Sequence, residues 1–313
     1  MTARTFTIDA RGSRLSLRQV ELVSAAFRAA QPGVRLDVRE IRTEGDRSSA
    51  PLSVIGGFGV FTKAIEDALL AGECDIAVHS LKDLPPQLTP GVVIAAVPAR
   101  GDVRDALVAP AGARLEDLPA GARIGTGSER RAVQLRALRP GIETPDIRGN
   151  VDTRIRKVDA GDYDAAVLAM AGLERLALTS RASQVFSVDE MTPAVGQGAL
   201  AVQAREDDGE AIELLRAIEH APTRVAVEAE RAFLARLGAG CGMPIGAYAT
   251  FEGADLHMRV MAADETGAVF RASARSGPAH SNSVRAAVSL GEDLAAQVLA
   301  YLAARSGKDA RDA

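Results

Sequence analysis

The chain has only two cysteines, Cys74 and Cys241, among its 313 residues, and it has no tryptophan. Two cysteines form neither a disulfide framework nor a zinc-binding pattern, so we expect a reducing compartment and no metal site. Apolar runs such as Val92 to Val97 are far too short to span a bilayer, and Met1 to Arg14 has no apolar core of signal-peptide length. These absences predict a cytoplasmic protein that does not bind a membrane.

The chain also lacks a large excess of charge of either sign. Its formal net charge is −4, with 47% hydrophobic and 25% charged residues, which is ordinary for a globular protein. A general nucleic-acid-binding surface is therefore not expected, because such a surface needs a basic excess. A length of 313 residues suits two or three domains.

Several common site motifs are missing as well. Gly125 and Gly127 are followed by Arg130 where the dinucleotide-binding fingerprint needs its third glycine, and there is no P-loop. No nucleophilic serine has the flanking glycines of a hydrolase. The spacing of the histidines does not match that of metal ligands; they are His79, His220, His257 and His280. Nucleotide, metal and hydrolase sites are thus disfavoured.

Helical patterns alternate with short apolar strands through the first two thirds of the chain. This alternation predicts an α/β fold with a largely parallel sheet. A second such unit begins near Gly101, and three strand-like runs between two helices predict an α+β module from about Thr223 onward. The strands expected in the two α/β units are Thr5 to Ile8, Val34 to Val38, Asp75 to Val78, Val92 to Val97, Asp105 to Ala109, a strand ending at Gly125, another at Asp146 to Asn150, Ala165 to Met170 and Ala199 to Ala204.

Cys241 lies in a loop that is rich in glycine, between Gly238 and Pro244. The helical pattern from Thr223 to Leu237 ends there, and Gly238 is a suitable residue to end a helix. A rigid helix would thus deliver one sterically open sulfur. The loop alone is equally compatible with a structural cysteine, because free cysteines are usually buried hydrophobic residues.

Arginines recur at or near predicted helix N-termini: Arg11, Arg130, Arg131, Arg148 and Arg154. A cation is unfavourable there because the helix dipole is already positive. An anion that neutralises these side chains would explain the pattern, since arginine binds carboxylate and phosphate in a two-pronged geometry. The alternative is a solvated surface on which each arginine has an internal ion-pair partner.

Asp83 is the acidic residue of most interest. It follows a predicted strand and Lys82, and it precedes Leu84, Pro85 and Pro86, which restrict the backbone. In α/β sheets, ligands bind beyond the carboxyl ends of the strands, where Arg11 to Ser13 and His79 to Asp83 are both expected. A lone aspartate in a loop is more often a turn or cap residue, so the residues alone leave its role open.

Taken together, the motifs resemble those of the porphobilinogen deaminase (hydroxymethylbilane synthase) family. The match spans nearly the whole chain in the family's order, and several motifs are long and specific. They are Arg11-Gly12-Ser13, Phe61-Thr62-Lys63, Asp75 to Pro85, Gly125-Thr126 with Arg130-Arg131, Arg148 to Val151, Ala171-Gly172-Leu173, Val195 to Ala199, and Gly240-Cys241 with Pro244-Ile245-Gly246.

The resemblance implies two α/β lobes like those of type II periplasmic binding proteins, followed by a C-terminal α+β domain. The implied boundaries are residues 1–99 with 199–217 for domain 1, 100–198 for domain 2 and 218–313 for domain 3. Periodicity could not have indicated that the chain returns to domain 1.

The resemblance also implies an activity in tetrapyrrole biosynthesis. A transferase of this family deaminates four porphobilinogen molecules and joins them head to tail onto a dipyrromethane cofactor, bound to Cys241 through a thioether. Hydroxymethylbilane is then released by hydrolysis. The implied protein is a monomer whose partner is this small substrate, with no nucleic acid, membrane or metal.

By resemblance, Asp83 is the catalytic carboxylate, which would stabilise the cation formed when ammonia leaves. The residues implied to bind the cofactor are Cys241, Arg130, Arg131, Lys82, Ser128, Asp83 and Arg154. Those implied to bind substrate are Arg11, Ser13, Thr126, Arg148, Arg154, Arg175 and Gln197. Each pyrrole carries an acetate and a propionate, which suits the arginines.

The sequence departs from the common family pattern at four positions: Phe58 replaces a frequent lysine, Ala64 a glutamate, Gly127 a serine and Gly242 a glutamine. None of these is a residue to which bond-making is assigned. A second hypothesis is a two-lobed solute-binding protein for a polycarboxylate that catalyses nothing. It would explain the lobes and arginines, but not Asp83 beside Lys82, the third domain or Cys241.

Overall fold

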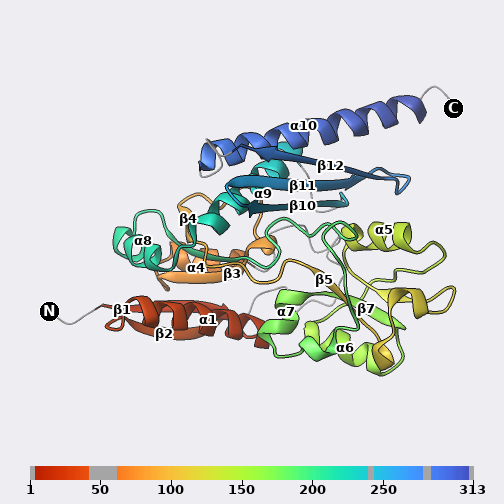
Figure 1. Ribbon diagram of the computed structural model, residues 1–313. Helices are drawn as coiled ribbons and strands as arrows, with labels where there is room; N and C mark the ends of the chain where they lie inside the picture. Colours follow the sequence, from red (N-terminus) through yellow and green to blue (C-terminus); the bar gives the residue numbers. More distant parts are fainter. Residues whose placement is uncertain (1–3, 42–61, 239–242, 278–282, 310–313) are drawn as a thin grey trace. The chain divides into compact units, whose positions relative to one another are not determined.

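The computed structural model describes residues 4–41, 62–238, 243–277 and 283–309 (Figure 1). The chain forms two compact units, Met1–Gly101 with Gly198–Arg224, and Asp102–Gln197 with Val225–Ala313. The expected loop at 43–54, the Gly56–Gly59 segment and Cys241 lie outside the described residues. The three-domain division stays a prediction, because this two-unit division groups residues of the second and third domains together.

The first unit is built on a five-stranded sheet with the order β2-β1-β3-β9-β4. Strands β1 and β2 pair in parallel, as do β1 and β3, whereas β9 is antiparallel to both β3 and β4. The strands are β1 (Thr5–Arg11), β2 (Arg35–Ile41), β3 (Ile76–Ser80), β4 (Val92–Ala96) and β9 (Leu200–Arg205).

The sheet is largely parallel, as expected, because β2, β1, β3 and β4 run in one direction and β9 alone runs against them. The chain leaves the unit near Gly101 and returns at Gly198, whose carbonyl accepts a 3.2 Å hydrogen bond from the Gly101 N–H. Because it returns beside the carboxyl end of β3, where Leu200 pairs with Ser80, the strand that follows must run in the opposite direction.

Helix α1 (Arg14–Ala30) packs along this sheet, as Figure 1 shows, and has the predicted apolar face. Val20, Val23 and Phe27 are almost completely buried in a core with strand residues such as Ile8. Ser13 caps the helix as expected, because its hydroxyl accepts the Ser16 N–H at 3.2 Å. Among the described residues, the other helices of this unit are α4 (Lys63–Leu70) and α8 (Gly209–Leu215), with 3₁₀ turns at Leu81–Asp83 and Arg216–Ile218.

In the second unit, residues 102–197 form a four-stranded sheet with the order β6-β7-β5-β8. Strand β7 is parallel to β6 and antiparallel to β5. The strands are β5 (Asp105–Val108), β6 (Ile124–Gly125), β7 (Ala165–Ala169) and β8 (Gln184–Val185), and the helices are α5 (Glu129–Leu138), α6 (Val151–Asp159) and α7 (Met170–Arg175).

The predicted strand that ends at Asp146–Asn150 does not form. The segment runs beside β6, but it makes only an isolated bridge between Arg123 and Glu143 and a 3.0 Å hydrogen bond from the Thr126 N–H to the Pro145 carbonyl. Pro145 has no N–H to donate, so a regular ladder is interrupted at that point.

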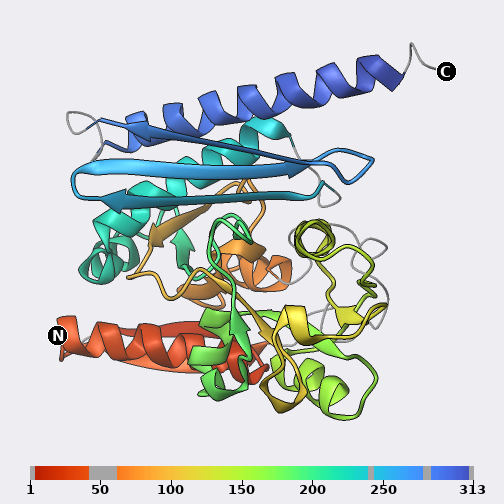
Figure 2. The ribbon, with the colours of Figure 1, turned by 45° about the vertical axis from the view of Figure 1, so that its right-hand side comes forward.

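The C-terminal part of the second unit is an antiparallel sheet of β10 (Ile245–Glu252), β11 (Asp255–Ala263) and β12 (Val269–Ser276), with α9 (Ala221–Leu237) and α10 (Val284–Asp309). Figure 2 shows α10 running along this sheet. The core includes Phe233 of α9 and Leu294 of α10. A Cβ on Gly291 would lie 2.1 Å from the Ala229 carbonyl oxygen, so glycine permits the close approach of the two helices.

The expected α/β fold class is confirmed: two mixed sheets carry helices, and a C-terminal α+β part follows them. Within the described residues, no helix is both long and apolar enough to cross a membrane.

Candidate functional site

Asp83 lies in a short 3₁₀ turn, Leu81–Asp83, that directly follows β3. Leu81 and Leu84 are each 1% exposed and hold the two sides of the turn in the core, whereas Asp83 is exposed. The Leu81 N–H donates to the Ala199 carbonyl at 3.0 Å, and the Leu84 N–H donates to the Leu81 carbonyl at 3.1 Å. The protein thus presents one carboxylate on a rigid support.

Arg11 and Ser13 lie at the same edge of the sheet as Asp83. Strands β1 and β3 are parallel neighbours, with Ile8 paired with Ile76, so their carboxyl ends meet there. Gln19 of α1 donates to the Ser80 hydroxyl at 2.8 Å and ties the helix to the end of β3. The structure therefore brings Arg11, Ser13, Lys82 and Asp83 to one edge, where a ligand site is expected in such sheets.

His79 lies behind this edge and is buried. Burial, together with the positive charge of Arg11, lowers the pKa of His79 to about 4. The imidazole is therefore neutral at neutral pH, and it adds no positive charge to this edge of the sheet.

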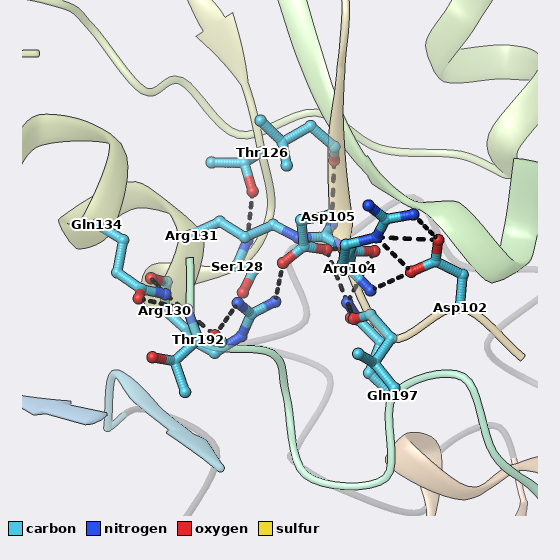
Figure 3. A network of polar contacts seen from close by, with 12 residues as sticks. Asp102, Arg104, Asp105, Thr126, Ser128, Arg130, Arg131, Gln134, Thr192 and Gln197 are labelled. Atoms are coloured by element: carbon cyan, nitrogen blue, oxygen red, sulfur yellow. Dashed lines mark hydrogen bonds and ion pairs between the residues drawn. The ribbon is translucent and has the colours of Figure 1, made fainter. Parts of the chain in front are cut away.

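Arg130 and Arg131 lie in the first turn of α5, as predicted, and both side chains are buried. Their guanidinium groups meet on the carboxylate of Asp105 (Figure 3): Nη2 of Arg130 lies 2.9 Å from Oδ2, and Nη2 and Nε of Arg131 lie 2.6 and 3.1 Å from Oδ1. The anion expected for these two arginines is thus supplied, in part, by the protein itself.

Arg130, Arg131 and Asp105 form an arginine cluster in which one carboxylate faces two cations. Burial alone would raise the pKa of Asp105, but the charges of Arg130 and Arg131 outweigh it and hold that pKa far below its usual range. The pKa of Arg130 is lowered by burial and by the charge of Arg131, against the opposing effect of Asp105. Within the described residues, Arg130 Nε is buried and has no hydrogen-bond partner.

Gln197, predicted to bind substrate, belongs to the same cluster and is 1% exposed. Its Nε2 donates to Asp105 Oδ1 at 2.9 Å and to the Val103 carbonyl at 2.7 Å. Thr126 and Ser128 lie in the turn between β6 and α5, where the Ser128 N–H donates to the Thr126 hydroxyl at 3.2 Å. Two of the predicted arginines and Gln197 are therefore brought together by Asp105.

The remaining predicted arginines lie near two other helices of this unit. Arg148 precedes α6 and pairs with Asp146, with Nε 2.7 Å from Oδ2. Arg154, within the first turns of α6, donates from Nε to the Gly149 carbonyl at 2.8 Å. Arg175 ends α7, is partly buried, and has its pKa lowered by that burial.

Two residues of this cluster were missed by sequence reasoning. Asp105 opens a strand whose residues are all completely buried, and an acidic residue in such a strand is a signal that could have been used. Gln134 is completely buried, accepts the Thr192 N–H at 2.8 Å and donates to the Thr192 carbonyl at 3.2 Å. An isolated glutamine in a helix gives no comparable signal.

The segments on either side of Cys241 are described. Gly238 ends α9 with a φ of 60°, which confirms its predicted role as a helix-ending residue. On the other side, the Ala247 N–H donates to the Pro193 carbonyl at 3.0 Å. A Cβ on Gly246 would lie 2.7 Å from the Pro193 carbonyl oxygen and 3.1 Å from Cδ of Arg130. The start of β10 is therefore packed against the arginine cluster.

We expect Gly246→Ala to lower the thermal unfolding midpoint by several degrees, because a methyl group forced against backbone costs about 1–3 kcal/mol. Differential scanning calorimetry measures this directly. The matched control is Gly209→Ala, where a Cβ has nothing within 4 Å and which should change the midpoint little. Equal midpoints for the two variants would show that β10 does not depend on this close approach.

Comparisons with known proteins agree with the sequence motifs. Residues 6–213 match the family described as porphobilinogen deaminase, dipyromethane cofactor binding domain, and residues 225–300 match porphobilinogen deaminase, C-terminal domain. A porphobilinogen deaminase of Roseiflexus sp. (strain RS-1) is 49% identical over 86% of this chain and 89% of its own. One from Syntrophobacter fumaroxidans (strain DSM 10017 / MPOB) is 45% identical over 91% of this chain and 93% of its own.

Among solved structures, the L-cystine solute receptor of Neisseria gonorrhoeae matches 68% of this chain and 85% of its own, at 14% identity and a TM-score of 0.40.

The family matches cover far more than half of the chain, and the relatives are similar along nearly their whole length. The chain therefore belongs to the porphobilinogen deaminase family, whose members are transferases that carry a dipyrromethane cofactor.

Proposed function

We propose that this chain joins four porphobilinogen molecules into hydroxymethylbilane with Asp83 as its catalytic carboxylate and Cys241 as the covalent anchor of the cofactor. The single observation that carries the role of Asp83 is its support: an exposed carboxylate between two buried leucines, at the sheet edge that also holds Arg11 and Ser13. A carboxylate held in this way needs little reorganisation when charge develops near it.

Asp83 acts on the substrate in two ways. Departure of ammonia from porphobilinogen leaves a positive charge, which the carboxylate stabilises where it develops. Its two oxygens also accept pyrrole N–H groups and so orient the carbon that forms the new bond. Lys82 precedes Asp83 in the same turn, and its ammonium group binds a carboxylate of the pyrroles.

The arginine cluster of the second unit fits a dipyrromethane group, which carries several carboxylates. Two buried guanidiniums share one internal carboxylate, and Arg130 Nε is a buried donor without a hydrogen-bond partner in the described part of the chain. Both features suit an added carboxylate. When bound, the dipyrromethane supplies the pyrrole carbon to which the first substrate is joined, and Arg130, Arg131, Ser128, Arg154, Lys82 and Asp83 hold it.

The growing chain gains two carboxylates with each pyrrole, so its binding requires cations spread over an extended surface. The residues that bind it are Arg11, Ser13, Thr126, Arg148, Arg154, Arg175 and Gln197. Arg148 donates from Nε to Asp146, and Arg154 donates from Nε to the Gly149 carbonyl, so both guanidinium groups lie near the start of α6, where a carboxylate of the growing chain would meet two cations. The protein acts in the cytoplasm, which its two cysteines favour, and it binds no nucleic acid, which agrees with its net charge of −4. The family resemblance is the ground for proposing a monomer.

The test of this proposal is a reaction balance. Purified protein given porphobilinogen should release four molecules of ammonia for each hydroxymethylbilane formed, and both can be measured in the same sample. A protein that only binds a polycarboxylate would take up ligand without releasing ammonia, and that result would rule out the catalytic reading.

A further inference from the structure

Asp105 is a completely buried carboxylate at the start of β5, and none of the roles above uses it. Its backbone is fixed on two sides: it pairs with Ala169 of β7, and its carbonyl accepts the Phe186 N–H at 2.9 Å. The side chain therefore projects from a backbone position that is held on both sides, which makes it suited to hold other side chains in place.

Arg131 is fixed by Asp105 along one edge of its guanidinium group. Two of its nitrogens, Nε and Nη2, both contact Oδ1, and the third, Nη1, donates to the Val167 carbonyl at 3.0 Å. A planar group held at three points by a strand carboxylate and a strand carbonyl cannot turn freely. The orientation of Arg131 is thus set by the sheet.

Arg130 is held differently. Its Nη2 contacts Asp105 Oδ2 and its Nη1 donates to the Thr192 carbonyl at 2.7 Å, but Nε has no partner among the described residues. Figure 3 shows the two guanidinium groups gathered around the same carboxylate, with Gln197 alongside it. Asp105 contacts only Nη2 of Arg130, so the buried Nε–H remains available as a hydrogen-bond donor.

The net charge of the cluster also suits an added carboxylate. Two buried cations and one buried anion leave one formal positive charge, and the two glutamines that contact the cluster, Gln134 and Gln197, are neutral. Burying both arginines without any anion would be costly, whereas two internal anions would leave no charge for a ligand. A single aspartate permits burial and keeps one positive charge for an added carboxylate.

We propose that Asp105 is a positioning residue for cofactor assembly: it holds Arg130 and Arg131 in the orientation that receives a carboxylate of the dipyrromethane, with Arg130 Nε as an added donor. This inference rests on the proposed function of the two arginines. Gln197, one residue before the chain returns to the first unit at Gly198, supports the same carboxylate through its 2.9 Å contact.

The test follows the loading of cofactor-free protein. Wild type, Asp105→Asn, Asp105→Glu and Asp159→Asn are produced in cells that make no porphobilinogen, then mixed with porphobilinogen, and their intact masses are followed over time. Asp159 pairs with Arg181 on the surface of the same unit, so its variant removes an exposed aspartate–arginine ion pair outside the cluster.

The expected rate constant of mass gain per folded molecule is the same in wild type and Asp159→Asn. It is several-fold lower in Asp105→Glu, which keeps the charge but moves it, and more than tenfold lower in Asp105→Asn. Circular dichroism gives the folded fraction. A merely structural role would lower that fraction and leave the rate constant per folded molecule unchanged, which would overturn the proposal.

If Asp105→Asn does not fold, Asp105→Glu decides the matter, and loading at the wild-type rate overturns the proposal. Normal loading by every variant would refute the role of Asp105 while leaving the proposed function intact. No mass gain by wild type would instead refute the proposed function itself.

Discussion

Asp83→Asn should lower porphobilinogen turnover by about 10²–10³-fold, because that is the typical cost of removing one electrostatic stabiliser from an active site. Asparagine keeps the size of the side chain but has no charge to oppose the cation left when ammonia departs. The change should fall on kcat, since the carboxylate acts as charge develops and not mainly in substrate binding. Steady-state measurement of ammonia release gives both constants.

The fold should survive this substitution. Asp83 is exposed, and Leu81 and Leu84 hold the turn through burial, which asparagine does not alter. Asp67→Asn is the matched control, because Asp67 is an exposed aspartate of the same unit that pairs with Lys63 on α4. It should turn over porphobilinogen at the wild-type rate. Near-normal turnover by Asp83→Asn would contradict the catalytic role.

Cys241→Ser should abolish both the cofactor and turnover. A thioether requires sulfur, and a serine hydroxyl is a far poorer nucleophile near neutral pH than a thiol. The loss should therefore be larger than that of Asp83→Asn, whose protein is expected to retain its cofactor. Intact mass and ammonia release, measured on the same preparation, separate these two outcomes.

The chain offers its own control in the second cysteine. Cys74 is buried, and burial raises the pKa of its thiol well above the usual value, so it is not a reactive group. Cys74→Ser should keep the added mass even if the buried hydroxyl lowers stability. Loss of the added mass in Cys74→Ser, with retention in Cys241→Ser, would show that the anchor has been misplaced.

The sequence predicted most of the elements that carry these residues. Helix α1 has the predicted face and the predicted cap at Ser13, and Asp83 follows β3 as expected. These features depend on residues close together in the chain, where periodicity and capping rules apply. The family was also recognisable, since its motifs are themselves short local stretches.

Contacts between distant residues were not predictable in this way. The arginines of α5 were expected to await a ligand anion, yet Asp105, 25 and 26 residues earlier, supplies one carboxylate to both. Strand β9 was expected in a largely parallel sheet, but the position at which the chain returns makes it antiparallel. Such pairings follow from how the strands come together, which a single sequence does not state.

The most direct test of the account is the intact mass of the wild-type protein, purified from cells that make porphobilinogen. We predict an excess of two linked pyrrole units over the mass of the polypeptide, absent in Cys241→Ser and present in Cys74→Ser. An unmodified wild-type mass, together with no release of ammonia from porphobilinogen, would contradict the account.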